Sequence, residues 1–289
     1  MVRGAVRREF RFRTSVWQAD VDAFGELKSS ALLRFLQETA TRASTEAGFD
    51  PAFYERQGTL WLVRRTMLTQ LAPIRYGDDL EATTWVADFR RVRSRRDYEV
   101  RVGDEVVARA STDWVYVERF GGRPRRIPAE MQGALGVDGA AALERPPFPG
   151  GTPPAGAARS TRRVQLHDLD ALRHVNNASY VHYVEQAAAD ADHAAGWPLA
   201  VGLAVGGRFR AVAHDLEYLD AAVYGDEIVL LTWPRAVLAD AVERHTLLVR
   251  GGAERPLLHA VSRYAWVDEA GEPCPLPIGL RAALGGAGA

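Results

Sequence analysis

The sequence predicts an α+β protein made of two tandem copies of one unit, each an antiparallel sheet wrapped around a single long helix. Three observations support this fold class. Short motifs recur at a constant spacing, each half contains one long amphipathic helical pattern, and each such pattern is followed by a series of β-type segments. Two such units in one chain can pair as a built-in dimer.

The recurring motifs lie 148 residues apart. The D-x-D-A motif around Asp22 returns around Asp170, and YGDDL from Tyr76 returns as YGDEI from Tyr224. Two motifs that share one offset, and that are far apart within each half, are not expected by chance. The later pair DWVYV and RYAWV is offset by 150 residues, which predicts a slightly longer loop in the second half.

One long helix is predicted in each half, over residues 29–48 and 176–196. Apolar residues in both segments recur with the three- and four-residue spacing of a helix face. Gly48 and Gly196 are suitable stop residues, and Asn176 or Asn177 is a good N-cap. The residues predicted on the buried faces are Leu32, Leu33, Leu36 and Ala40 in the first helix, and Tyr180, Val181, Val184 and Ala188 in the second.

β-branched and aromatic residues follow each helix in alternating runs. These runs predict strands over residues 60–71, 79–89, 96–102 and 105–118, and again over residues 209–219, 227–237, 243–251 and 257–269. The Pro-, Gly- and Ala-rich residues 145–159 lack apolar periodicity and read as a linker. The predicted domains are therefore residues 1–144 and 160–289.

The bulk composition bounds the class of protein. With 47% hydrophobic and 25% charged residues and a mean hydropathy of -0.18, the chain has the composition of a soluble globular protein. No apolar run approaches the roughly 20 residues that span a bilayer, so no membrane association is expected. The N-terminus carries charges where a signal peptide would need an apolar core, which predicts a cytoplasmic protein.

Charge and cysteine content exclude further classes. A net charge of -1 argues against nucleic-acid binding, which usually needs a basic domain. Cys274 is the one cysteine, so an internal disulfide and a multi-thiolate metal site are excluded. No glycine-rich phosphate loop, serine elbow or metal-ligand spacing is present, and no cofactor is expected.

Chemistry-bearing residues gather in HDLDALRHVNNASYVHYVEQ, which begins at His167. Asp170 precedes a predicted helix, and an aspartate there can act as a base or nucleophile. His174 can polarise a carbonyl or relay a proton, and the first turn of the helix offers free backbone N–H groups for an oxyanion. The competing interpretation is structural, because aspartate and asparagine near a helix start are usually turn or cap residues.

The order D-x-D-A-x-x-H-V-N-N-x-x-Y resembles hotdog-fold thioesterases. The first half, from LQETA through WLVRRTM to RIPAEM, resembles the N-terminal hotdog of acyl-acyl-carrier-protein (acyl-ACP) thioesterases. Together the resemblance covers nearly the whole chain. It implies a double hotdog fold and a cofactor-free hydrolase. The substrate would be a fatty-acyl thioester of acyl carrier protein or coenzyme A, and the pseudo-dimer could associate further.

The resemblance also implies roles for individual residues. Asp170 would be the base or nucleophile, His174 would assist it, and backbone donors from Val175 to Asn177 would form the oxyanion hole. Asn176 is as readily a capping residue as a catalytic one. Tyr180 would line the acyl chain, as would Trp61 and Val63 from the first half.

The match to the plant enzymes is incomplete. They carry an asparagine where this chain has Leu172, and a glutamate where it has Ala221 beside Asp220. Either Glu185, about three helical turns after His174, or Asp220 could complete the site.

The first copy keeps Asp22 but has Glu26 in place of the histidine, which predicts one active site and a first half used as acyl pocket. A patch of arginines could dock an acidic carrier protein, although a solvated turn is the simpler interpretation. Its members are Arg90, Arg91, Arg93, Arg95, Arg96 and Arg101, of which Arg93, Arg95 and Arg96 are the candidate carrier contacts. Two alternative functions are a non-catalytic acyl-thioester-binding protein and a hotdog dehydratase.

Overall fold

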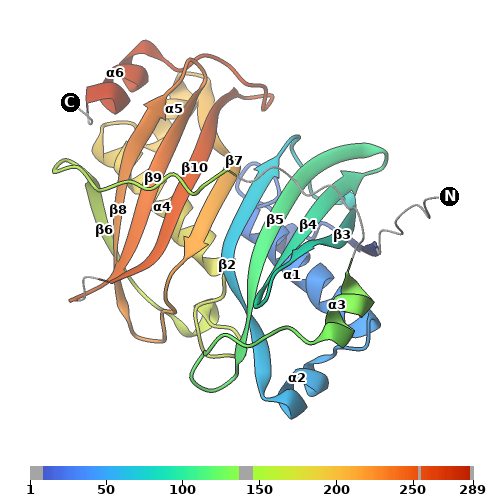
Figure 1. Ribbon diagram of the computed structural model, residues 1–289. Helices are drawn as coiled ribbons and strands as arrows, with labels where there is room; N and C mark the ends of the chain where they lie inside the picture. The colour runs from blue at the N-terminus through green and yellow to red at the C-terminus, as the bar shows by residue number, and fades with distance from the viewer. Residues whose placement is uncertain (1–8, 137–145, 253–254, 287–289) are drawn as a thin grey trace. The chain divides into compact units, whose positions relative to one another are not determined.

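The computed structural model describes residues 9–136, 146–252 and 255–286 (Figure 1). The chain divides into two compact units, Met1–Pro146 and Pro147–Ala289. The predicted linker, residues 145–159, begins at a residue outside the described ranges and ends inside a strand. Within the described residues, no helix is long and apolar enough to cross a bilayer.

The first unit contains a five-stranded antiparallel sheet with the strand order β1-β3-β4-β5-β2. The strands are β1 (Phe10–Ser15), β2 (Thr59–Gln70), β3 (Asp79–Phe89), β4 (Arg93–Val102) and β5 (Glu105–Glu118). The long helix α1 (Ser29–Glu46) contacts β1 and β3. Three short helices complete the unit: η1 (Gln18–Asp20), α2 (Pro51–Gln57) and α3 (Ala129–Leu135).

The second unit repeats this order as β6-β8-β9-β10-β7, again antiparallel. The strands are β6 (Ala158–Arg163), β7 (Gly207–Tyr218), β8 (Glu227–Val237), β9 (Ala241–Arg250) and β10 (Pro256–Asp268). The long helix α4 (Ser179–Ala194) packs on β6, β8 and β9 (Figure 1). The other helices are η2 (Leu166–Asp168), α5 (Leu199–Ala204) and α6 (Ile278–Gly286).

Both long helices bury the faces that their sequences predict. All eight residues on the two predicted faces are at most 8% exposed. Removing such side chains from water is the main term that holds each helix to its sheet. Gly48 and Gly196 follow the helix ends with φ angles of 93° and 84°, the left-handed conformation that favours glycine as a stop.

The predicted strands are confirmed with small shifts at their ends. Three of them, β3, β5 and β8, have the predicted bounds. The connection after β9, residues 251–255, is longer than Gly103–Asp104 after β4, as the change in offset predicts. The helix α2 was not predicted, although Asp50 caps it by accepting the Phe53 N–H (2.7 Å) and a proline occupies its first position.

The start of the second unit lies along its own sheet. The ring of Phe148 contacts His259 of β10, with centroids 6.0 Å apart. A Cβ added to Gly151 would lie 3.0 Å from the His245 ring of β9, which itself stacks on Trp233 of β8 at 5.1 Å. Glycine at position 151 therefore lets the backbone approach an aromatic face closely.

Each sheet buries one arginine at the same repeat position, but with different neighbours. Arg244 on β9 forms an ion pair with Asp192 of α4, with the two side chains 3% and 12% exposed. Its counterpart, 148 positions earlier, is Arg96 on β4, which is 7% exposed. Ser44 replaces the aspartate there and hydrogen-bonds to the Tyr54 hydroxyl (2.8 Å). Burial lowers the pKa of Arg96, and nearby Tyr98 and Tyr54 oppose that shift.

Candidate active site

The D-x-D-A segment of the second unit forms a tight loop before α4. The Asp170 N–H donates to the His174 carbonyl (2.9 Å), and the Arg173 N–H donates to the Asp170 carbonyl (2.9 Å). One carboxylate oxygen of Asp170, Oδ1, accepts the Leu172 N–H at 2.8 Å. These bonds bring the predicted base and the predicted histidine into one turn. They also give Asp170 a structural task, as the turn interpretation predicts.

The segment Asp220–Val223 lies beside this loop. The Val175 N–H donates to the Ala222 carbonyl (2.9 Å), and His174 forms a β-bridge with Val223. The second segment is therefore fixed next to the candidate catalytic residues through the backbone.

The first unit contains the same loop. The Asp22 N–H donates to the Glu26 carbonyl (2.8 Å), and the Gly25 N–H donates to the Asp22 carbonyl (3.2 Å). Asp22 Oδ1 accepts the N–H groups of Phe24 and Glu26 at 2.8 and 3.0 Å. The backbone is thus conserved between the repeats while the histidine is not.

One position of the loop has an unusual backbone conformation. Gly25 has a φ of 75°, and its counterpart Arg173 has a φ of 63°. Arg173 is the one residue other than glycine with a positive φ among the described residues. The left-handed region is disfavoured for a residue with a Cβ, so the arginine is strained where the other repeat uses glycine.

The start of α4 differs from the predicted cap. The helix begins at Ser179 after Ala178, whose side chain forms no cap hydrogen bond. Asn176 instead accepts the Ala178 N–H through Oδ1 (2.9 Å) and stabilises the turn before the helix. This result corrects the N-cap prediction for Asn176 and Asn177.

Two of the three predicted oxyanion donors are already occupied. The Val175 N–H donates to Ala222, and the Asn176 N–H donates to the Asp168 carbonyl at 2.8 Å. Within the part of the chain that the structure describes, the Asn177 N–H has no acceptor. The oxyanion hole is therefore reduced to one backbone candidate, Asn177, near the positive end of the α4 dipole.

Tyr180 is a structural anchor of the site. It is 2% exposed, and its hydroxyl accepts the Ala222 N–H at 3.1 Å. Its ring lies 5.9 Å from the rings of both Tyr183 and Tyr218, and the Tyr218 hydroxyl donates to the Asn177 carbonyl (3.1 Å). Burial raises the pKa of Tyr180 to about 12, so its hydroxyl stays protonated. The acyl contact expected of Tyr180 stays a prediction.

Glu185 and Asp220 are the two candidates to replace the glutamate for which this chain has Ala221, and they have different neighbours. Glu185 Oε1 lies 3.1 Å from His214 Nε2, and His214 Nδ1 lies 2.8 Å from the Ser262 hydroxyl. Glu185 is thus engaged with a histidine that is 2% exposed. Asp220 lies on the segment that hydrogen-bonds to the site loop, and its Oδ2 is 3.8 Å from Arg250. Of the two, Asp220 has the backbone connection to Asp170 and His174.

The predicted acyl-pocket residues Trp61 and Val63 lie on β2 and are half-buried. The Trp61 indole N–H donates to the Tyr54 hydroxyl (3.1 Å), and its ring lies 5.0 Å from that of Tyr116. Trp61, Tyr116 and Tyr54 therefore form an aromatic cluster in the first unit. Its role in binding an acyl chain stays a prediction.

The three candidate carrier contacts of the predicted docking patch do not share one surface. Arg93 is exposed, and Arg95 is half-buried with its Nε 3.4 Å from Asp113. Arg96 is buried, because its position on β4 points away from the solvent side. Arg96 is therefore removed from the patch. The predicted strand begins only at residue 96, whereas β4 begins at Arg93, and the alternating faces of a strand put Arg96 opposite Arg93 and Arg95.

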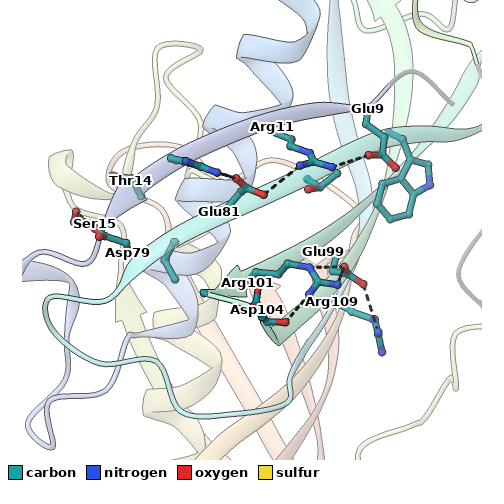
Figure 2. A pocket seen from close by; sticks show the side chains of 15 residues that line it. Glu9, Arg11, Thr14, Ser15, Asp79, Glu81, Glu99, Arg101, Asp104 and Arg109 are labelled. Carbon is teal, nitrogen blue, oxygen red and sulfur yellow. Dashed lines mark hydrogen bonds and ion pairs between the residues drawn. The ribbon is translucent and has the colours of Figure 1, made fainter.

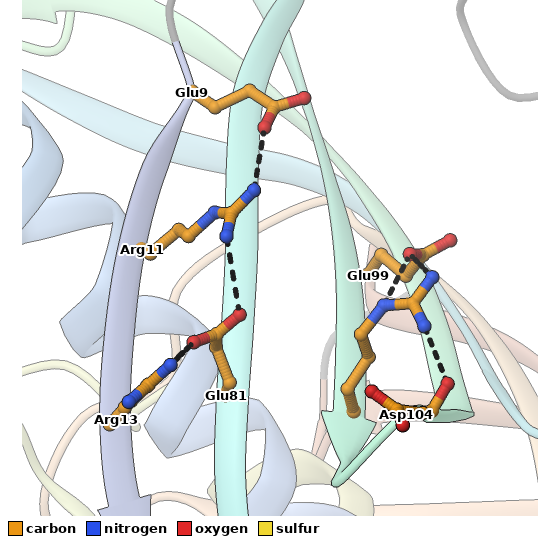
Figure 3. Close-up of polar contacts among 7 residues, drawn as sticks. Glu9, Arg11, Arg13, Glu81, Glu99 and Asp104 are labelled. Carbon is orange, nitrogen blue, oxygen red and sulfur yellow. Dashed lines mark hydrogen bonds and ion pairs between the residues drawn. The ribbon is translucent and has the colours of Figure 1, made fainter.

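A polar groove of about 1180 Å³ lies over β1, β3, β4 and β5 of the first unit (Figure 2). Its ionic side chains neutralise one another (Figure 3): Arg13 Nε lies 2.6 Å from Glu81, and Arg101 lies 2.8 Å from Glu99. Four arginines face five carboxylates, so the groove is unsuited both to an apolar chain and to an acidic protein. The lining arginines are Arg11, Arg13, Arg101 and Arg109, and the acids are Glu9, Asp79, Glu81, Glu99 and Asp104.

No group of three or more acidic, histidine or cysteine side chains arranged to hold a metal ion occurs among residues 9–136, 146–252 and 255–286. The candidate site consists of the loop, the start of α4 and residues 220–223, which the backbone contacts described above hold together.

An antiparallel sheet with one long helix against it, present twice in tandem, defines a double hotdog protein. Solved structures have the same fold. An acyl-ACP thioesterase from Bacteroides thetaiotaomicron is 17% identical with a TM-score of 0.72, covering 89% of this chain and 97% of that one. The 12:0-ACP thioesterase from Umbellularia californica is 20% identical with a TM-score of 0.72, covering 92% and 98%.

Residues 7–135 match the family model of the acyl-ACP thioesterase N-terminal domain. The palmitoyl-acyl carrier protein thioesterase of Arabidopsis thaliana is 26% identical over 203 residues, which cover 62% of this chain and 47% of the relative. The chain thus spans about half the length of the curated relatives that it matches. These findings confirm the predicted resemblance to the acyl-ACP thioesterase family.

Proposed function

We propose that the protein hydrolyses fatty-acyl thioesters of acyl carrier protein, or of coenzyme A, and releases the free fatty acid. The observation that carries this proposal is the loop of the second unit. It holds an aspartate and a histidine in one turn just before α4, and the Asn177 N–H, two residues ahead of that helix, has no acceptor among the described residues. The family match of the first unit supports the same substrate class.

The loop supplies the groups that thioester hydrolysis needs. Asp170 uses Oδ1 for the turn, and Oδ2 has no other partner within the described residues, so Oδ2 is available to take a proton from water. The hydroxide then adds to the carbonyl carbon, and the C–S bond breaks as the thiolate leaves. The Asn177 N–H and His174 are suited to stabilise the oxyanion that forms between these steps.

The roles of the remaining residues follow from their contacts. Asn176 and Tyr180 fix the start of the helix and the neighbouring segment, so they position the site. Glu185 pairs with His214 and is assigned to the stability of the second unit. The aromatic cluster around Trp61, together with Val63, is proposed to accommodate the acyl chain.

The direct test is thiol release from acyl-ACP and acyl-CoA thioesters of graded chain length. Wild-type protein should turn over a preferred length, and His174→Ala should lose most of that activity while keeping its circular dichroism spectrum. General acid–base groups typically contribute about 10²–10⁴-fold to a rate, so the loss should be readily measured. Intact thioester after long incubation would reject the hydrolase.

A second candidate function is a non-catalytic acyl-thioester-binding protein. The observation that favours it is the shared backbone of the two loops, because Asp22 also stabilises its turn, by accepting the N–H two residues ahead, in a repeat that lacks the histidine. Leu172 and Ala221 stand where the plant enzymes carry polar groups. Tight binding of a thioester that is never cleaved would identify this function.

Asp220→Asn is expected to lower kcat by about tenfold or more, because it removes the one carboxylate on the segment that adjoins the loop. Glu185→Gln should leave kcat within about threefold of wild type and lower the Tm, because it weakens a contact with a buried histidine. Steady-state kinetics and thermal unfolding of both variants check the assignment. If Glu185→Gln lost most of its kcat and Asp220→Asn did not, Glu185 would be the catalytic acid and Asp220 the structural one.

A further inference from the structure

The structure assigns a carrier-binding role to Arg173, the strained arginine between Asp170 and His174. We infer that its guanidinium binds the phosphate of the phosphopantetheine arm, which acyl carrier protein and coenzyme A share. The inference rests on the proposed function, since it names the part of the same substrate that Arg173 recognises.

The loops of the two repeats share their backbone and differ in the residue that takes the left-handed position. Both loops close with the same two backbone hydrogen bonds, and both place one residue in the left-handed region. The first unit uses Gly25 there, which adopts that conformation without strain. The second unit uses Arg173 in the same turn, so the arginine is disfavoured by the backbone that it occupies.

The Arg173 side chain makes no polar contact that would serve the fold among the described residues. Arg173 is exposed, and its side chain has no hydrogen bond or ion pair with any residue that the structure describes. Its backbone N–H makes the Arg173–Asp170 bond that glycine makes equally well in the first unit. Among the described residues of the second unit, no hydrogen bond or ion pair of the Arg173 side chain therefore offsets the strain. A residue kept in a strained conformation at a candidate site is better explained by a ligand.

The positive charge of Arg173 suits an anionic ligand. Two neighbouring arginines are committed to carboxylates: Arg250 Nε lies 2.9 Å from Asp226, and Arg255 lies 3.8 Å from Asp220. Arg173 is the arginine on the loop itself, and its charge is not neutralised. Guanidinium groups bind phosphate through paired, charge-assisted hydrogen bonds. In an acyl thioester of either carrier, the phosphate is the anionic group common to both.

The experiment uses four thioesters with the same acyl group: acyl-pantetheine, acyl-phosphopantetheine, acyl-CoA and acyl-ACP. Arg173→Gly removes both the charge and the strain, and Arg173→Met removes the charge alone. Arg281→Met is the matched control, because Arg281 is an exposed arginine on α6 of the same unit.

Both Arg173 variants should raise KM by roughly tenfold for the three phosphate-bearing thioesters and leave KM for acyl-pantetheine unchanged. Arg281→Met should leave all four values unchanged. Arg173→Gly, but not Arg173→Met, should also raise the Tm by about 2–4 °C, since glycine relieves the strain. This combination of weaker binding and higher stability would not arise from a damaged fold.

The inference would be overturned if, for each of the four thioesters, the Arg173 variants had the same KM as wild type. A loss confined to acyl-ACP would overturn it as well, because it would indicate contact with the carrier protein surface. Calorimetric titration with pantetheine and with phosphopantetheine measures the contribution of Arg173 to binding affinity independently of turnover. If wild type cleaves none of the thioesters, the proposed hydrolase fails, while a phosphate-dependent difference between wild type and Arg173→Met in the titration would still support the binding site.

Discussion

Asp170→Asn should reduce kcat for thioester hydrolysis by about 10²–10⁴-fold without lowering the Tm. In the wild-type protein Asp170 Oδ1 accepts the Leu172 N–H at 2.8 Å. The asparagine side chain keeps an oxygen that can accept the same N–H, so the turn is preserved. It cannot take a proton from water or attack a carbonyl. The variant therefore removes the chemistry of Asp170 while retaining its structural contact.

The first unit provides a matched control. Asp22→Asn makes the same chemical change in the same turn, where Oδ1 accepts the Phe24 N–H at 2.8 Å. It should leave kcat and Tm near their wild-type values. If Asp22→Asn and Asp170→Asn lower kcat equally, both aspartates are turn residues and the proposed single active site is wrong. Initial rates at saturating substrate, with thermal unfolding of each variant, decide between these results.

Arg244→Met should lower the free energy of unfolding by about 3–5 kcal/mol, because it leaves the buried Asp192 without its partner. Burial raises the pKa of Asp192 to about 6 from its usual 3.8, and Arg244 opposes that shift. A folded-state pKa above the unfolded value favours folding at low pH, and this contribution is lost as pH rises through about 6. The penalty in Arg244→Met should thus shrink below pH 6, where Asp192 is protonated.

Two further variants test the cause of this penalty. Arg244→Met combined with Asp192→Leu should recover most of the lost stability, since no charge then remains buried. Arg96→Met in the first unit should cost less than about 1 kcal/mol, because Ser44 stands in place of the aspartate. Urea unfolding at two pH values measures all of them. A cost for Arg96→Met as large as that for Arg244→Met would show that packing, and not the ion pair, dominates.

The fold could be predicted from the sequence because its signals are periodic and doubled. The faces of both long helices follow from apolar spacing, and β3, β5 and β8 have the predicted bounds. The short helix α2 was missed because seven residues are too few for a periodic signal, although the Asp50–Pro51 pair was a readable start signal.

The candidate site could be predicted less completely. The motif located Asp170 and His174 in one loop. It could not show that the N–H groups of Val175 and Asn176 donate to the carbonyls of Ala222 and Asp168. It also could not show the burial of Arg96 or the partner of Glu185, because both depend on contacts between strands and helices far apart in the chain. Backbone angles such as that of Arg173 have no sequence signal unless a repeat supplies a glycine for comparison.

The paired loops have an evolutionary consequence. In a protein that self-associates from identical single units, one codon change alters every copy of a turn at once, so an advantage in one copy cannot be separated from a disadvantage in the other. Once both copies lie in one gene, each turn is inherited and selected separately. The turn of the first unit can then keep Gly25 and Glu26 while the turn of the second unit carries Arg173 and His174. A tandem arrangement thus allows a single mutation to change one turn and to leave its counterpart unchanged.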